Sequence, residues 1–175
     1  RQRQMCIRDR LEEYDLFSNN FSDDILIAYK KIINGYVIEP GVDLSGADLR
    51  LAILRFADLR GADLSNAYLG AADIRLADLR FANLTGADLE KADLEQADLS
   101  NANLFNALLI DADLSNADLS DVNLSNADLS GADLSNADLS GVIAQNLTSC
   151  PSALPADWVC DCLLYTSDAA DEHGC

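Results

Sequence analysis

Residues 42–66 read VDLSG-ADLRL-AILRF-ADLRG-ADLSN, and this pattern of five residues continues without a gap to residue 141. Residues 42–141 therefore contain 20 repeats. The central position is Leu in every repeat except at Ile74, and the position two before it is Ala except at Val42 and Val122. The position between these two is Asp or Asn in all but three repeats, which carry Ile53, Tyr68 and Leu108. A frame this regular indicates a repeat architecture.

A period of five fits neither an α-helix, with about 3.6 residues per turn, nor a strand with alternating side chains. A chain that turns a corner every five residues does place every Leu on one side. Four such sides close a square coil, and successive coils stack at the strand spacing of about 4.8 Å. The sequence thus predicts an all-β solenoid of about five coils, with Leu and the small Ala inside. The predicted core includes Leu44, Leu49, Leu54, Leu59, Leu64, Ile74, Leu94, Leu114 and Leu134.

The A-(D/N)-L-x-x frame resembles the pentapeptide-repeat family, and the resemblance covers residues 42–141. It implies that these residues fold as a right-handed quadrilateral β-helix. It is much less specific for function, because most of the family has no assigned activity. Some members bind DNA gyrase by imitating duplex DNA, usually as dimers. The resemblance therefore predicts the fold and leaves the function open.

The two ends of the chain differ in character from the repeats. Met5–Asp9 and Cys162–Ser167 can be encoded by DNA strings that are reverse complements over nearly their whole length. An inverted pair of this kind resembles sequencing-library adapters, so we interpret residues 1–10 and 162–175 as translated adapter sequence. Under this interpretation the remainder is a fragment of a longer protein, and its cellular compartment is unknown.

Residues 11–41 precede the repeats and are predicted to form a helical N-terminal cap and a lead-in. Ser22 followed by two Asp residues is typical of a helix start, and Asn34-Gly35 is typical of a helix end. The helix is expected to cover the first coil, and a helix that binds a partner is the alternative. Its apolar face contains Ile25, Tyr29, Ile32 and Ile33. A strand and a turn are expected over residues 36–41.

Residues 142–161 follow the repeats and are predicted to close the solenoid, because an open coil exposes core Leu and unpaired backbone. Similar Cys-Pro…Leu-Pro…Trp-Val-Cys segments follow repeat blocks in some family members. Cys150 and Cys160 are candidates for a disulfide if the protein is exported, and two free or buried thiols are the alternative. A zinc site is a weaker third alternative, because this segment has two thiols and no His.

Charge restricts the classes of partner. Thirty acidic residues against 12 basic ones give a formal charge of −18. This balance argues against direct nucleic-acid binding and against docking on anionic lipid. No apolar run approaches a bilayer span, so no membrane span is predicted. Every basic residue lies at or before Lys91, and the later repeats therefore carry unbalanced negative charge.

Residues twenty positions apart stack in a four-sided coil, which predicts columns of outward side chains. One acidic column contains Asp58, Asp78, Asp98, Asp118 and Asp138, and a second contains Asp73, Asp93, Asp113 and Asp133. We interpret these residues first as suited to the tight backbone and to solubility. One alternative is imitation of DNA towards gyrase or another topoisomerase. Calcium binding is a weaker alternative, because the Gly-rich motif of calcium-binding solenoids is absent.

Outward apolar residues form two groups. The first contains Leu51, Phe56, Leu76 and Phe81, and residues 11–35 are expected to cover it. The second contains Phe105, Leu108 and Ile110, and we predict that these three residues form a patch for a protein partner, here called the partner patch.

The Ser residues lie in repeat turns without a nearby His or Lys base in the later coils, so no enzyme is predicted. No catalytic residue, cofactor or metal ligand is predicted either. We expect a non-catalytic structural or protein-interaction module. Its partner is expected to be another protein, a second copy in a homodimer, or a further repeat block of the same chain.

Overall fold

A computed structural model describes residues 31–156, 158 and 159 of the chain. The described part begins with an antiparallel hairpin of two strands, β1 (Lys31–Ile33) and β2 (Tyr36–Ile38). Asn34 and Gly35 connect the strands and have φ angles of 51° and 86°. Two consecutive positive φ angles define a type I′ turn, for which Asn-Gly is a favoured pair.

The hairpin corrects part of the predicted N-terminal helix. The sequence pattern assigns Ile32 and Ile33 to the helix, whereas both lie in β1. Asn-Gly ends helices and also forms hairpin turns, and here the pairing of β1 with β2 decides between them. Ile33 packs against the core, while Ile32 is 61% exposed. Residues 11–30 of the predicted cap lie outside the described residues, and no helix is present among those that are described.

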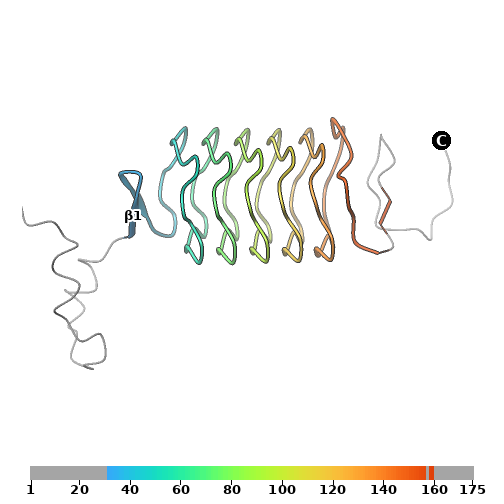
Figure 1. Ribbon diagram of the computed structural model, residues 1–175, viewed down its shortest axis with the longest axis horizontal. Coiled ribbons are helices and arrows are strands. Elements are labelled where there is room, and N and C mark those ends of the chain that lie inside the picture. Colours follow the sequence, from blue (N-terminus) through green and yellow to red (C-terminus); the bar gives the residue numbers. More distant parts are fainter. Residues whose placement is uncertain (1–30, 157, 160–175) are drawn as a thin grey trace, which may run out of the picture. The chain divides into compact units, whose positions relative to one another are not determined.

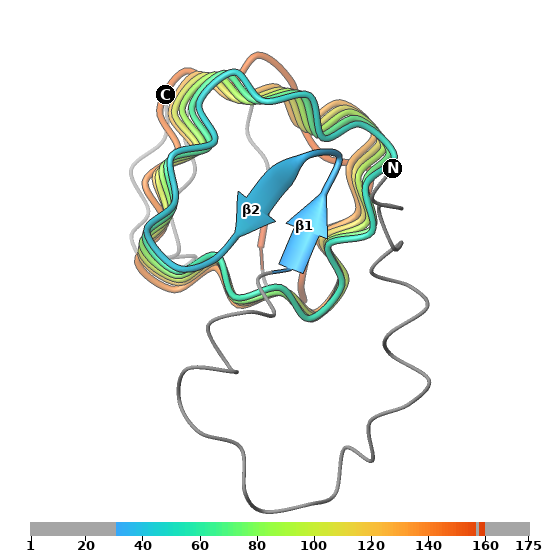
Figure 2. The same ribbon diagram turned by 90° about the vertical axis from the view of Figure 1, so that its left-hand side faces the viewer.

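After the hairpin the backbone winds as a four-sided coil, which Figure 2 shows end-on. Parallel bridges join residues twenty positions apart along residues 43–143. At the first bridge, Leu44 donates its N–H to the carbonyl of Asp63 at 2.7 Å, and Asp63 donates to the carbonyl of Val42 at 2.9 Å. Successive coils consequently lie side by side in Figure 1. The predicted stacking of every fourth repeat is therefore present as a backbone hydrogen-bond ladder.

The ladder continues beyond the last regular repeat. The pairs are Asn123 with Ile143, Asp128 with Ser149, and Asp133 with Ala153. Ser149 lies 21 positions after its partner, so one additional residue is accommodated between Ile143 and Ser149. Val142, Leu147 and Leu154 pack against the core. The segment predicted to close the solenoid thus extends its sheet over residues 142–153.

The interior of the coil is filled by the central Leu and the preceding Ala of each repeat. All nine residues predicted for the core are at most 2% exposed, and the Ala residues between them are buried as well. No charged or polar residue is buried among the described residues. Four Leu side chains per coil leave little room at the second inward position, which holds Ala in every repeat except those with Val42 and Val122, because interiors are packed nearly without voids.

Each corner of the coil is a type II turn. Ala47 donates its N–H to the carbonyl of Leu44 at 3.0 Å, and Gly46 between them has a φ of 65°. A positive φ at the third turn residue alone is characteristic of type II. The last position of every later repeat also has a positive φ. From Asn101 onward this position holds only Asn, Asp or Gly, the residues that adopt it most readily. Earlier repeats place other residues there, including Leu51, Phe56, Leu76 and Phe81.

Leu51→Asn is expected to raise the free energy of unfolding by about 1 kcal/mol. Leu51 has a φ of 58° and is 76% exposed, so the substitution relieves strain and loses little packing. Urea unfolding followed by circular dichroism measures the change. Leu51→Ala is the control, because Ala lacks the short polar side chain by which Asn stabilises this left-handed conformation, so it should gain little. A destabilised Leu51→Asn protein would mean that the Leu side chain makes contacts worth more than the strain.

Candidate interaction surface

The outward Asp and Asn of each repeat have a structural role in the turn. The Asp118 carboxylate accepts a hydrogen bond from the backbone N–H of Ser120 at 2.9 Å, and Asn123 accepts one from Ser125 at 3.0 Å. This is the Asx-turn geometry, in which a short side chain replaces a backbone acceptor. The bond supports the interpretation that Asp and Asn suit this backbone. It does not require a charge, because Asn provides the same oxygen.

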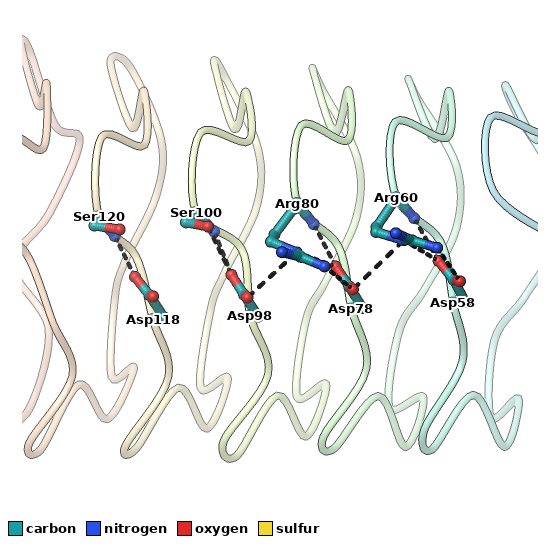
Figure 3. Close-up of polar contacts among 8 residues, drawn as sticks. All are labelled: Asp58, Arg60, Asp78, Arg80, Asp98, Ser100, Asp118 and Ser120. Atoms are coloured by element: carbon teal, nitrogen blue, oxygen red, sulfur yellow. Dashed lines mark hydrogen bonds and ion pairs between the residues drawn. The ribbon is translucent and has the colours of Figure 1, made fainter.

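The first acidic column forms an ion-pair ladder that stops partway along the solenoid (Figure 3). Arg60 contacts Asp58 at 2.7 Å and Asp78 of the next coil at 3.6 Å. Arg80 likewise contacts Asp78 at 2.7 Å and Asp98 at 3.5 Å. In the following coils Ser100 and Ser120 replace these arginines and donate hydrogen bonds to the carboxylates without bringing a positive charge.

In the second acidic column the ion pairs stop at a similar point along the solenoid. Arg75 contacts Asp73 at 2.7 Å and Asp93 at 3.1 Å. Asp113 and Asp133 instead accept hydrogen bonds from the N–H groups of the Ser residues two positions later. Over residues 92–141 there are ten acidic residues and no basic one. The solenoid is therefore charge-compensated in its early coils and strongly acidic in its later coils.

The pKa shifts follow these contacts. Hydrogen bonds from Arg60 and Arg80 hold the pKa values of Asp58 and Asp78 below their ordinary value, and Arg75 lowers the pKa of Asp73 in the same way. In the later coils hydrogen bonds from Ser135 and Ser140 lower the pKa values of Asp133 and Asp138. Carboxylates of both columns thus stay ionised at neutral pH, with and without a cation beside them. The residues concerned are Asp58, Asp73, Asp78, Asp133 and Asp138.

Arg80→Gln is expected to lower stability at pH 6, and the difference from the unchanged protein should shrink on acidification from about pH 4. Asp78 has a lowered pKa when folded, so its ion pair stabilises the fold above the unfolded pKa and is lost as pH falls through the folded one. Urea midpoints at several pH values measure this. Arg55→Gln is the control, because Arg55 has no carboxylate within ion-pair distance among the described residues and interacts with Asp73 only at longer range, so its pH-dependent effect should be smaller. A difference that does not depend on pH would contradict the prediction.

A third column of outward residues is mostly neutral and contains Asp43, Asp63, Asn83, Asn103 and Asn123. Asn83 donates to Asp63 at 3.1 Å, and Asn123 donates to Asn103 at 3.2 Å, so amides bridge successive coils. This side carries far less charge than the two acidic columns. The surface therefore differs from side to side as well as along the chain.

The partner patch lies within the acidic half. Phe105 is 40% exposed, Leu108 is 43% exposed and Ile110 is half-buried. Leu108 pairs in the ladder with Asp88 on one side and Asp128 on the other, so carboxylates flank it in its own column. As an aliphatic residue it provides no oxygen for the Asx bond. Leu108 thus occupies a position at which the turn favours Asp or Asn.

The early coils carry a larger apolar surface than the sequence indicated. Leu51, Ile53 and Phe56 are between 67% and 76% exposed. Leu76 follows Phe56 at the same corner, where Phe56 donates its N–H to the carbonyl of Arg75. Ile53 was visible in the sequence only as an exception to the Asp/Asn rule. Whether residues 11–30 cover this surface lies outside the described part of the chain.

Three further expectations concern the cysteines, metal binding and membrane spans. Cys150 is disulfide-bonded, and Cys160 lies outside the described residues. Within the described ranges no group of three His, Cys, Asp or Glu side chains is arranged to hold a metal ion. The same ranges contain no helix long and apolar enough to cross a bilayer.

The chain is similar to known repeat proteins. The family described as pentapeptide repeats matches segments that together span residues 40–141. A comparison with curated proteins gave no match. A pentapeptide repeat protein of the cyanobacterium Cyanothece 51142 has 27% identity and a TM-score of 0.48, with 66% of this chain and 85% of that chain covered. One from the Arabidopsis thaliana thylakoid lumen has 37% identity and a TM-score of 0.47, with 54% and 64% covered.

A third solved structure, a pentapeptide repeat protein of Nostoc Pcc 7120, has 38% identity and a TM-score of 0.45, with 59% of this chain and 84% of that chain covered. The family match alone extends over more than half of the chain, in the residues that form the repeats. The five-residue frame, the four-sided ladder and this match lead to one conclusion. The chain belongs to the pentapeptide-repeat family, whose fold is a right-handed quadrilateral β-helix.

Proposed function

We propose that this chain is a non-catalytic module that binds another protein through the partner patch and the acidic surface around it. The observation that carries the proposal is the position of Leu108, an exposed aliphatic residue between Asp88 and Asp128 in one column. Solubility alone favours Asp or Asn there, as in most other repeats. An apolar residue within a charged surface is typical of a binding site.

The architecture supports this role because the residues that hold the fold together differ from those that face outward and can contact a partner. The inward Leu and Ala and the backbone ladder hold the coil together, and they are nearly uniform along the repeats. The outward positions are then free to vary without loss of the core. Proteins of this family are generally structural or interaction modules.

Photo-crosslinking tests the proposal. A benzoylphenylalanine at position 105 should label one protein in an extract of cells that express the gene, and excess unlabelled protein should compete. The same probe at position 120, on another side of the acidic half, is the matched control and should not label it. Leu108→Asp should abolish the crosslink while leaving the fold intact, because Asp is the common residue of that column. Equal labelling from both positions would contradict the proposal.

Imitation of DNA is the second candidate function, and the ten uncompensated acidic residues of residues 92–141 favour it. A gyrase supercoiling assay tests it at micromolar protein. The matched control replaces Asp98, Asp118 and Asp138 by Asn, which keeps each Asx bond and removes three charges. Inhibition that this control loses would support the imitation of DNA. No inhibition by the unchanged protein would exclude it.

A further inference from the structure

The first coils carry an exposed apolar patch. Its residues differ from the repeat pattern in two ways, at the corner with positive φ and at the Asp/Asn position. We define the first-coil patch as Leu51, Ile53, Phe56 and Leu76. Leu51 and Phe56 adopt φ angles of 58° and 59°, which are unfavourable for such residues. Ile53 replaces the Asp or Asn that accepts the N–H two residues on, so Arg55 lacks the Asx bond. Exposed apolar residues retained against local preference are typical of a binding surface.

Two cations border the first-coil patch. Arg55 lies between Ile53 and Phe56, and its guanidinium lies 5.2 Å from the centre of the Phe56 ring. Lys31 of β1 donates from Nζ to the carbonyl of Arg55 at 3.2 Å. Neither side chain forms an ion pair within the described ranges, whereas Arg60, Arg75 and Arg80 each contact two carboxylates. The rim of this patch thus carries two cations outside ion-pair distance of the described carboxylates, and Arg55 interacts only at longer range with Asp73, which Arg75 pairs directly.

The partner patch has the opposite rim. Its flanking carboxylates are Asp88, Asp111 and Asp128, and none of them lies within ion-pair distance of a described cation, whereas Arg50 and Lys91 interact at longer range with Asp88 and Asp111. Lys91 is the cation at this border, and Glu90 engages it at 2.5 Å. Asp128 accepts hydrogen bonds from Ser130 and Ser149, which fix its orientation without compensating its charge. One molecule thus carries two apolar patches with rims of opposite charge.

We infer that the first-coil patch of one molecule docks on the partner patch of a second copy. This inference rests on the proposed function, since it names the occupant of the same partner patch. Apolar residues then cover apolar residues, while Lys31 and Arg55 approach carboxylates. A contact between two partner patches is disfavoured, because it would place two acidic surfaces together.

The predicted contact is heterologous and leaves one patch free on each molecule. Ile53 belongs to the column of Asp73, and Leu108 to the column of Asp88, so the two patches lie on different sides of the coil. A contact between different surfaces does not close on itself in a pair. Association is therefore expected to proceed beyond a dimer in a head-to-tail manner.

Two variants that restore the repeat's own residues test the inference. The first combines Leu51→Asn with Phe56→Asn, since Asn occupies the last position of many repeats, including Asn116 and Asn136 in the column of Phe56. The second combines Phe105→Ser with Leu108→Asp, since Ser and Asp are common in these columns. Both should fold, because each new residue already occurs at equivalent positions. Sedimentation velocity of the purified full chain over a range of concentrations is the measurement.

The unchanged protein should form species larger than a dimer as its concentration rises, and each variant alone should remain monomeric. An equimolar mixture of the two variants should form a dimer that does not extend, because each supplies the patch that the other lacks. Arg55→Glu should weaken association at least about tenfold. Glu95 occupies the same column in a later coil, so this substitution is compatible with the fold.

Several outcomes would overturn the inference. A monomeric unchanged protein up to about 1 mM would do so, as would a mixture of variants that stays monomeric. A dimer lost only in the Phe105→Ser, Leu108→Asp variant would indicate a symmetric contact instead. If the chain is monomeric but position 105 crosslinks a different protein, the inference fails and the proposed function stands. If position 105 labels nothing specifically, the proposed function fails as well.

Discussion

Leu94→Ala is expected to lower the free energy of unfolding by about 2–5 kcal/mol. Leu94 is fully buried in the middle of the solenoid, and its backbone N–H bonds to the carbonyl of Asp113 in the next coil. Truncation removes the buried methyl groups and leaves a cavity. The rest of the interior cannot collapse into this cavity, because the ladder fixes the distance between coils.

The matched control is Asp118→Asn, at an outward position of a later coil. Asn keeps the oxygen that accepts the N–H of Ser120, so its effect should be well below that of Leu94→Ala. Urea unfolding followed by circular dichroism compares the two proteins. Solenoids can unfold in parts, so the midpoint and the slope of the transition should both be recorded. Equally mild effects would mean that the assignment of inward and outward positions is wrong.

Asn116→Pro is expected to cost on the order of 3 kcal/mol, as proline does inside a helix, where it also removes a bonded backbone donor. Asn116 has a φ of 59°. The proline ring instead holds φ at a negative value, in the region of turns and extended chain. Asn116 also donates its N–H to the carbonyl of Ser135 at 2.9 Å, and proline lacks this donor. The corner therefore has to open in the middle of the ladder.

Ser115→Pro is the control for that substitution, one residue earlier in the same turn. The second residue of a type II turn has a negative φ that proline favours. The substitution loses only the hydrogen bond from the Ser115 N–H to the Asp113 carboxylate, and it restricts the unfolded chain. Its net effect should be small. Similar losses for both prolines, measured as thermal midpoints, would contradict the type II assignment of the corners.

Much of the fold was predictable because the five-residue period is a local property of the sequence. A Leu at every fifth position, with Ala two before it, admits one arrangement with all of them inside. The family and the quadrilateral β-helix are confirmed, and the 20-residue register follows from four sides per coil. The acidic columns were also predictable, since stacking needs only the number of residues per coil.

The helix predicted up to Ile33 was wrong at its end because local signals there are ambiguous. Asn34-Gly35 suits both a helix end and a hairpin turn, and pairing of Lys31 with Ile38 selected the hairpin. The ladder also runs past Gly141, because Ile143 finds a backbone partner in Asn123 although its repeat lacks the A-(D/N)-L frame. In both places the pairing of the backbone depends on which segments lie next to each other in space.

The sequence by itself determined the coil, its inward Leu and Ala, and the acidity of its later half. These follow from composition and spacing along one chain. Only the tertiary structure decided which arginine links two coils, and that Arg55 and Lys31 form no ion pair with a described residue at the first-coil patch. An ion pair and an exposed patch depend on distances between side chains of different coils. Those distances are set by backbone stacking and by turn angles that no single repeat specifies.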